Sequence, residues 1–152
     1  MEKDDYNIPG YKNHTDIVGK DVKKTSRIER YFDLAKNVAF NSPYGKIRHG
    51  AILVKGGSVR NVSFNKENYS SFGNRFRAKN TGPATVHAEL GCILGMSRGV
   101  TTGSDLYVCR INKEGDFRYS KPCSMCHEAL RHVGVKRVYY TTNDNTIEMY
   151  KL

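Results

Sequence analysis

The chain has 152 residues and a mass of 17.2 kDa, and its 25 Lys and Arg against 15 Asp and Glu give a formal net charge of +10. This length is enough for one domain with a buried core, and the lack of any repeat period excludes collagen, a coiled coil and a repeat array. No apolar run approaches the roughly 18 residues of a membrane span, and the polar N-terminal stretch has no apolar signal core. We therefore expect a cytoplasmic protein without membrane contact.

The positive charge and the four cysteines narrow the functional class. A sequence pI of about 9.5 indicates a polyanionic partner, such as nucleic acid or nucleotide phosphates, and a solvated basic surface is the alternative. In a reducing compartment, clustered cysteines are more often metal-binding or catalytic than disulfide-bonded. Cys92 and Cys109 stand singly within apolar runs, so we interpret both as small buried residues.

The N-terminal part of the chain predicts an arm followed by a helix. Residues 1–24 are charged and aperiodic, so we expect a loosely structured arm ahead of one domain over residues 25–152. The stretch Ser26–Glu29 (SRIE) fits a capping box, and apolar residues follow it at helical spacing. Asn41-Ser42-Pro43 predicts the end of this helix.

A hairpin and a long loop come next. The apolar runs Gly50–Lys55 and Ser58–Phe64 flank Gly56-Gly57, which predicts a β-hairpin. Residues 65–83 are polar, and a loop of this length in a small domain is usually functional or disordered. Basic and aromatic residues alternate within it, a pattern that suits contact with a nucleotide or a single strand, and a plain surface loop is the alternative.

The C-terminal half alternates helices with strands. A second helix is predicted from about residue 83 to Arg98 with Gly99 as its stop, and a third from Pro122, as its first helical residue, to about Val133 with Gly134 as its stop. Strands are predicted over 105–111 and 136–142, a polar loop over 112–121, and a short strand or helical turn over 147–152. The order α-β-β-α-β-α-β indicates an α/β fold, with a mixed sheet covered by helices.

Two short motifs at the starts of the second and third helices carry the chemistry. His87 and Glu89 form an H-x-E pattern, and Pro122, Cys123 and Cys126 form a P-C-x-x-C pattern. Each pattern alone is weak, but together and in this order they match the signature of zinc deaminases. Cysteines at positions i and i+3 of a helix lie on one face, so both helix starts are expected to converge on one point.

This donor set suits a catalytic zinc ion, because catalytic sites use three protein ligands and keep the fourth position for water. His87, Cys123 and Cys126 are the three candidate ligands. A helix N-terminus favours the thiolate form that zinc requires. Zinc lowers the pKa of bound water from 15.7 to about 7. Glu89, two residues from a candidate ligand, is the candidate general acid and base.

Three alternatives fit parts of the same pattern. A structural zinc knuckle would need a fourth ligand, for which His127 and His132 are candidates. The stretch Cys123–His127 (CSMCH) also fits c-type haem attachment, and its two cysteines fit a thioredoxin-like redox pair. The remaining histidines, His14 and His49, are interpreted as surface or core residues.

Over residues 25–150, the chain resembles the cytidine and deoxycytidylate deaminase superfamily, through His87-Ala88-Glu89 and the stretch 120–142 (SKPCSMCHEALRHVGVKRVYYTT). The resemblance implies a three-layer α-β-α sandwich with about five strands, and hydrolysis of an exocyclic amine on a base. It implies His87, Cys123 and Cys126 as zinc ligands, Glu89 as the proton shuttle, and a homo-oligomer. Non-catalytic use of the same zinc-stabilised fold as a binding module is an alternative, which Glu89 argues against.

The resemblance and the basic residues also suggest substrate contacts. Asn65, directly after the second strand, is similar to an Asn that contacts the sugar in the family, and a turn residue is the alternative. Lys121 stands where tRNA adenosine deaminases commonly have an acidic residue, and is either near a phosphate or a solvated loop lysine. The other candidate substrate-binding residues are Ala88, Arg75, Arg77 and Lys79.

Two kinds of substrate follow from these features. In the first, the enzyme deaminates a free nucleotide such as dCMP, and the basic residues of the 65–83 loop bind its phosphate. In the second, a base of single-stranded DNA or RNA enters the pocket, which needs an extended basic and aromatic track. The short chain has no added recognition domain, so the sequence favours the free nucleotide.

Overall fold

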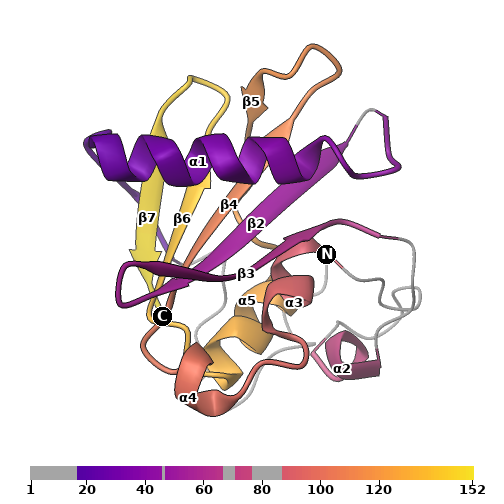
Figure 1. Ribbon diagram of the computed structural model, residues 1–152, viewed down its shortest axis with the longest axis vertical. Helices are drawn as coiled ribbons and strands as arrows, with labels where there is room; N and C mark the ends of the chain where they lie inside the picture. Colours follow the sequence, from indigo (N-terminus) through magenta and orange to yellow (C-terminus); the bar gives the residue numbers. More distant parts are fainter. Residues whose placement is uncertain (1–16, 46, 67–70, 77–86) are drawn as a thin grey trace.

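The computed structural model describes residues 17–45, 47–66, 71–76 and 87–152. It contains a seven-stranded sheet with the strand order β1-β7-β6-β4-β2-β3, in which β5 pairs with β4 outside this path (Figure 1). The strands are β1 (Lys20–Asp21), β2 (Arg48–Lys55), β3 (Ser58–Phe64), β4 (Asp105–Ile111), β5 (Phe117–Arg118), β6 (Arg137–Thr141) and β7 (Ile147–Lys151). The helices are α1 (Ser26–Ala39), α2 (Ser71–Asn74), α3 (Ala88–Ile93), α4 (Arg98–Thr101) and α5 (Ser124–His132).

The prediction of a three-layer sandwich around a mixed sheet is confirmed, with seven strands in place of about five. β4 and β6 are parallel, and the other paired strands are antiparallel. The two unpredicted strands, β1 and β5, have two residues each. A strand of two residues shows no alternation of apolar and polar side chains. The sequence pattern therefore places these residues in the arm and in the polar loop over 112–121.

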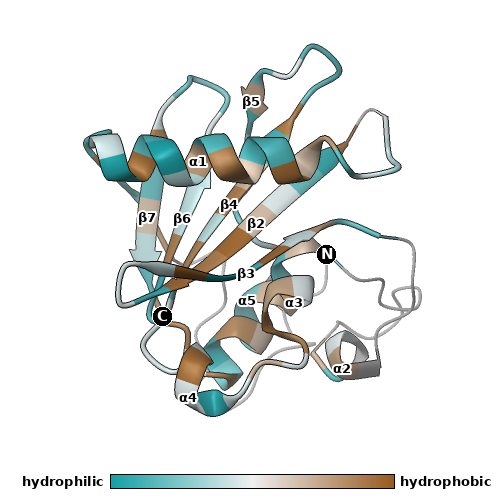
Figure 2. Cartoon of the chain, in the orientation of Figure 1, coloured by the Kyte–Doolittle hydropathy of each residue, from teal (hydrophilic) through white to brown (hydrophobic). Residues whose placement is uncertain are grey.

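The central strands bury both faces, because successive side chains of a strand point to opposite sides. In β2, Ile52 and Val54 pack with α1, whereas Ala51 and Leu53 pack with α3 and α5. β4 divides its side chains between the same two clusters. This double burial explains the apolar run Ala51–Val54 of β2, seen in Figure 2 as the brown part of a strand whose start is teal.

Helix α1 confirms the predicted first helix, with a correction at its start. Its N-cap is Thr25, whose side chain accepts a hydrogen bond from the backbone N–H of Ile28, so the capping residue is not Ser26. The helix buries an apolar stripe against β2 and β4, formed by Ile28, Phe32, Ala35, Val38 and Ala39. Cys92 and Cys109 are both fully buried, as predicted.

The predicted second helix is wrong in its extent. Helix α3 ends at Ile93, and a separate short helix, α4, contains Gly99, the residue expected as the stop. Gly95 has a φ of +76° and interrupts the helical path between them. A left-handed glycine ends a helix even where apolar periodicity continues past it, which is why spacing alone predicted one long helix.

Helix α5 begins at Ser124, two residues later than predicted. Cys123 is its N-cap, so Pro122 precedes the cap and is not the first helical residue. Gly134, with a φ of +88°, follows the helix as expected. The segment from Ile147 to Lys151 forms a strand and not a helical turn.

The chain ends and the long loop are only partly described. Of the predicted arm over 1–24, residues 17–24 are described, and Lys20 and Asp21 pair with Met149 and Glu148 of β7. Most of the 65–83 loop lies outside the described residues, as does His14. Within the described ranges, no helix is long and apolar enough to cross a bilayer.

Gly50 provides a test of the packing between α1 and the sheet. A Cβ atom on Gly50 would lie 2.1 Å from the carbonyl oxygen of Ala35 and 2.7 Å from the backbone nitrogen of Ala39. Gly50→Ala is therefore expected to reduce the free energy of unfolding by about 1–3 kcal/mol, measured by urea denaturation. Gly99→Ala, where the nearest atom is the Ser97 Oγ at 3.9 Å, is the control and should be neutral or slightly stabilising. Equal stability of the two variants would contradict this packing argument.

Candidate active site

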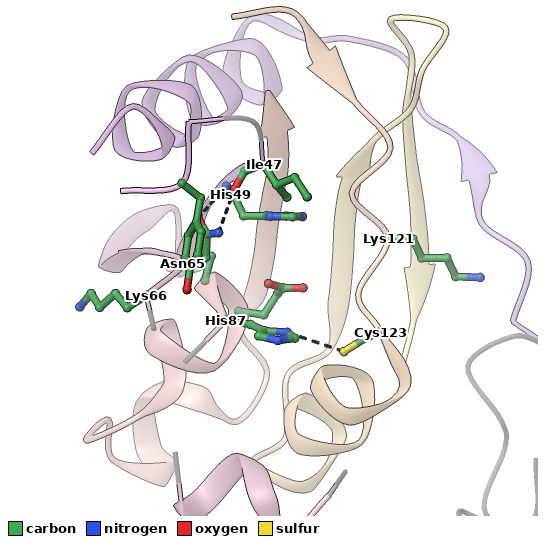
Figure 3. Close-up of a pocket in the computed structure, with 10 residues that line it drawn as sticks. Ile47, His49, Asn65, Lys66, His87, Lys121 and Cys123 are labelled. Carbon is green, nitrogen blue, oxygen red and sulfur yellow. Dashed lines mark hydrogen bonds between the residues drawn. The ribbon is translucent and has the colours of Figure 1, made fainter. Parts of the chain in front are cut away.

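The starts of α3 and α5 bring three potential metal donors together. His87 is the N-cap of α3, Cys123 is the N-cap of α5, and Cys126 lies in the first turn of α5. The His87 Nδ1 atom is 3.8 Å from the Cys123 Sγ and 3.3 Å from the Cys126 Sγ. Figure 3 shows His87 and Cys123 pointing toward each other from the two helices. The sequence therefore predicted the convergence of these helix starts correctly.

The three donors fit a tetrahedral metal site. Their ligand atoms all lie within 4.8 Å of one another. Zn–N and Zn–S bonds at a tetrahedral angle place nitrogen and sulfur about 3.5 Å apart, which agrees with the two observed separations. His87, Cys123 and Cys126 could thus hold one ion and leave a fourth position for another ligand.

The local electrostatics favour a thiolate at this point. The Cys126 thiol and the His87 ring both form hydrogen bonds to the Cys123 sulfur and hold the pKa of Cys123 well below its ordinary value, although burial opposes them. A thiolate is the form of cysteine that binds metal. The same contact raises the pKa of His87.

The alternative fourth ligands lie elsewhere. His127 is buried, with its Nδ1 atom 3.4 Å from the Tyr150 hydroxyl. The His132 Nε2 atom is 3.2 Å from an Arg98 guanidinium nitrogen. Among the described residues, the group that could hold a metal contains neither histidine, so these residues do not form a closed four-ligand site.

Glu89 lies beside the metal donors in an unusually buried position for a carboxyl group. It is in the first turn of α3 and only 5% exposed. Burial raises the pKa of Glu89 to about 7, and the nearby His87 partly opposes this shift. A carboxyl group with such a pKa can both accept and release a proton near neutral pH.

A pocket of about 380 Å³ opens onto these groups. Its size lies within the range of small-ligand sites. The residues that line it come from the loop before β2, from β2 itself, from the end of β3, and from the starts of α3 and α5: Tyr44, Ile47, His49, Asn65, Lys66, His87, Ala88, Glu89, Lys121 and Cys123. Ala88 and Asn65, two of the predicted substrate-binding residues, are therefore in the pocket wall.

Asn65 shapes the pocket through its side-chain amide. Its Oδ1 atom accepts a hydrogen bond from the His49 backbone N–H at 2.9 Å, and its Nδ2 atom donates to the Ile47 carbonyl at 3.0 Å (Figure 3). These bonds fix the start of β2 against the end of β3. Asn65 thus holds two neighbouring wall residues in place.

The interpretation of His49 as a surface or core residue is wrong, because its half-buried ring lines the pocket. Burial, with the positive charge of Arg110, lowers the pKa of His49 to about 4, so the ring is neutral at pH 7. The period of two residues along β2 was the available signal. Ala51, two residues later, points to the face that α3 covers, and so does His49.

The basic residues predicted to bind the substrate do not all lie at the pocket. Lys121 lines the pocket, but its Nζ atom donates a hydrogen bond to the Ile17 carbonyl, and Figure 3 shows it pointing away from His87. Arg75 lies over the rings of Phe72 and Phe76 and is not among the pocket residues. Arg77 and Lys79 lie outside the described residues. Lys66, which the sequence did not single out, is in the pocket wall.

Comparison with known proteins agrees with this geometry. The family described as the cytidine and deoxycytidylate deaminase zinc-binding region matches residues 25–142. The chain belongs to this deaminase family. No curated protein matches the sequence.

Solved structures of a deaminase from a phage share this architecture. The apo form of dCMP deaminase from the cyanophage S-TIM5 has a TM-score of 0.53 and 26% identity, with 78% of this chain and 86% of that chain covered. The same phage enzyme in complex with dCMP and dUMP has a TM-score of 0.52 and 26% identity, with 80% of this chain and 85% of that chain covered.

Membership of the deaminase family decides between the alternatives for the cysteine motif. The family is a zinc-binding one of hydrolytic enzymes, and a nitrogen and two sulfurs converge here from two helices. The predicted cofactor, Zn²⁺, is therefore confirmed, and the haem and thioredoxin-like interpretations are wrong.

Proposed function

We propose that this protein hydrolytically deaminates a cytosine-type base in a free nucleotide such as dCMP, releasing dUMP and ammonia. The observation that carries the proposal is the buried Glu89, which lines one pocket with His87 and Cys123, two of the three residues that could hold a metal ion with Cys126. The similarity to a phage dCMP deaminase, one of whose structures holds dCMP and dUMP, supports the choice of substrate.

His87, Cys123 and Cys126 are the proposed zinc ligands, because their mutual distances suit one tetrahedral ion. When bound, zinc supplies Lewis-acid chemistry that makes water acidic enough to lose a proton near pH 7. The positive ends of α3 and α5 both face this point and stabilise the thiolates there. The chain itself therefore provides the ligands and the field that the ion needs.

Glu89 is the proposed proton shuttle. Its carboxylate accepts the proton of the attacking water and passes it to the ring nitrogen next to the carbon under attack. It then carries a second proton to the exocyclic amine, which leaves as ammonia while the carbonyl of the uracil-type product forms. Burial keeps bulk water away from this carboxyl group, so the transferred protons stay within the site.

The remaining pocket wall orients the base. Ala88 is a small, fully buried residue between a proposed ligand and the proposed shuttle, so a flat ring can lie against the start of α3. The neutral ring of His49 forms part of the wall, held through its backbone by Asn65. A pocket of about 380 Å³ suits one nucleotide rather than a strand with several stacked bases.

The substrate proposal is tested by ammonia release from dCMP, CMP, deoxycytidine, cytosine, guanine and a single-stranded oligodeoxynucleotide. dCMP is expected to give the highest kcat/KM. Activity confined to the oligonucleotide would overturn the proposed substrate class in favour of a nucleic-acid deaminase. Absence of ammonia release from every compound, with zinc bound, would support a non-catalytic binding module.

The ligand assignment predicts the metal content of single variants. Cys123→Ser and Cys126→Ser are expected to purify with zinc well below stoichiometry, because each removes one of the three proposed protein donors. Cys92→Ala is the control, since Cys92 is a thiol as buried as that of Cys126 but outside the donor group, and its replacement should leave the zinc content unchanged. Elemental analysis of the purified proteins is the measurement, and full zinc occupancy in Cys126→Ser would refute the assignment.

The shuttle role predicts a separation of binding from catalysis. Glu89→Gln keeps the size and burial of the side chain but removes its proton-carrying group. It should lower kcat by about 10²–10⁴-fold while zinc content and substrate affinity are retained. Turnover kinetics and substrate titration of the zinc-loaded variant provide the measurement. A variant with near-normal kcat would show that another group moves the protons.

A further inference from the structure

A cross-strand row of side chains leads out of the pocket along the sheet. His49 of β2, which lines the pocket, is paired in register with Arg110 of β4, and Arg110 is paired with Arg118 of β5. Neighbouring strands are about 4.8 Å apart, so the two arginines stand one and two strands beyond the pocket wall. We refer to His49, Arg110 and Arg118 as the cross-strand row.

All three members of the row face the side of the sheet that carries the zinc donors. Cys109 and Ile111, the neighbours of Arg110 in β4, belong to the cluster under α1, so Arg110 points to the opposite face. Phe117 packs against the same α1 cluster, which places Arg118 on the face of Arg110. His49 is on this face because it lines the pocket beside Glu89.

Within the described part of the chain, neither arginine of the row forms an ion pair. The ion pairs there join Arg131 to Glu128 and Arg137 to Asp105, and neither involves the row. The Nε atom of Arg110 is buried and has no hydrogen-bond partner. The hydrogen bond given by the Arg118 side chain goes to the neighbouring Phe117 carbonyl.

Two paired arginines and a buried donor without a partner lower the stability of the folded protein unless an anion binds beside them. Like charges directly opposite on paired strands repel each other, and a buried donor without a partner loses its hydration without compensation. A guanidinium presents a rigid fork of donors whose geometry matches phosphate oxygens. The row therefore has the charge, the unused donor and the position of an anion site that adjoins the pocket.

We propose that the cross-strand row binds the phosphate monoester of the nucleotide substrate, with Arg110 as the residue that determines specificity for nucleotide over nucleoside. This inference rests on the proposed function and identifies the groups that recognise the phosphate. It assigns that role to β4 and β5. Of the basic loop residues predicted to bind the phosphate, Arg75 lies over two phenylalanine rings and is not among the pocket residues, and Arg77 and Lys79 lie outside the described residues.

Kinetics with and without the phosphate group test the role of Arg110. Arg110→Gln is expected to lower kcat/KM for dCMP about 10–100-fold, mainly through KM, and to change the value for deoxycytidine less than about twofold. Arg110→Lys, which keeps the charge but loses the fork, should give an intermediate loss. A fall in activity of Arg110→Gln that is equal for dCMP and deoxycytidine would overturn the proposal.

Arg48 supplies a matched control. It is next to His49 in β2, and its Nε atom is also buried without a hydrogen-bond partner, but it lies on the α1 face over the Phe40 ring. Arg48→Gln removes the same charge from the opposite side of the sheet, so it should leave both substrates unaffected. An Arg48→Gln variant that loses dCMP activity as strongly as Arg110→Gln would show that net charge, and not the row, is responsible.

Thermal unfolding in inorganic phosphate tests the anion site without catalysis. At constant ionic strength, replacing chloride with phosphate should raise the Tm of the zinc-loaded wild type and of Arg48→Gln, and should leave that of Arg110→Gln unchanged. Equal stabilisation of wild type and Arg110→Gln would overturn the proposal even if dCMP is deaminated. If the wild type deaminates no cytosine compound, the proposed function fails, and this measurement still decides whether Arg110 binds phosphate.

A short oligodeoxycytidine distinguishes the two sources of phosphate, because its internal phosphates are diesters. Arg110→Gln should lower kcat/KM for dCMP and leave kcat/KM for the oligonucleotide unchanged. An effect confined to the oligonucleotide would mean that the row follows a nucleic-acid backbone, and would overturn the proposed recognition of a monoester.

Discussion

The structure depends on the meeting of two helix starts at one point beside the sheet. Strands β4 and β6 are parallel, and α5 forms the crossover between them, so the start of α5 lies on the same face as α3. His87 and Cys123 cap these helices, and Cys126 follows one turn later. Each helix alone offers an incomplete donor set. The packing of both against β2 and β4 makes a site that could hold one ion.

The same packing determines the chemistry available around the donors. Glu89 is buried together with the apolar residues of α3, and this burial raises the pKa of its carboxyl group to about 7. His49 is kept neutral by burial with the charge of Arg110 beside it. The proposed hydrolytic deamination requires a carboxyl group that exchanges protons near pH 7.

The short strand β5 lies two strands from the pocket residue His49. It places Arg118 opposite Arg110, and the described residues provide no acidic partner for either. The chain as a whole has an excess of 10 positive charges, and Arg110 and Arg118 are the two of its basic residues that lie one and two strands beyond His49.

Local spacing along the chain was enough to predict the longer helices and strands, a mixed sheet covered by helices, and the motif residues His87, Glu89, Cys123 and Cys126. It did not determine the break at Gly95, the strands β1 and β5, or the place of His49 in the pocket. Those features depend on a left-handed glycine, on pairings of two residues, and on which face of β2 meets α3. The pairing of β1 with β7 and the place of His49 depend on contacts between segments that are distant in the sequence, so they follow from the tertiary structure alone. The break at Gly95 and the pairing of β5 with β4 are local, but too short to leave a periodic signal.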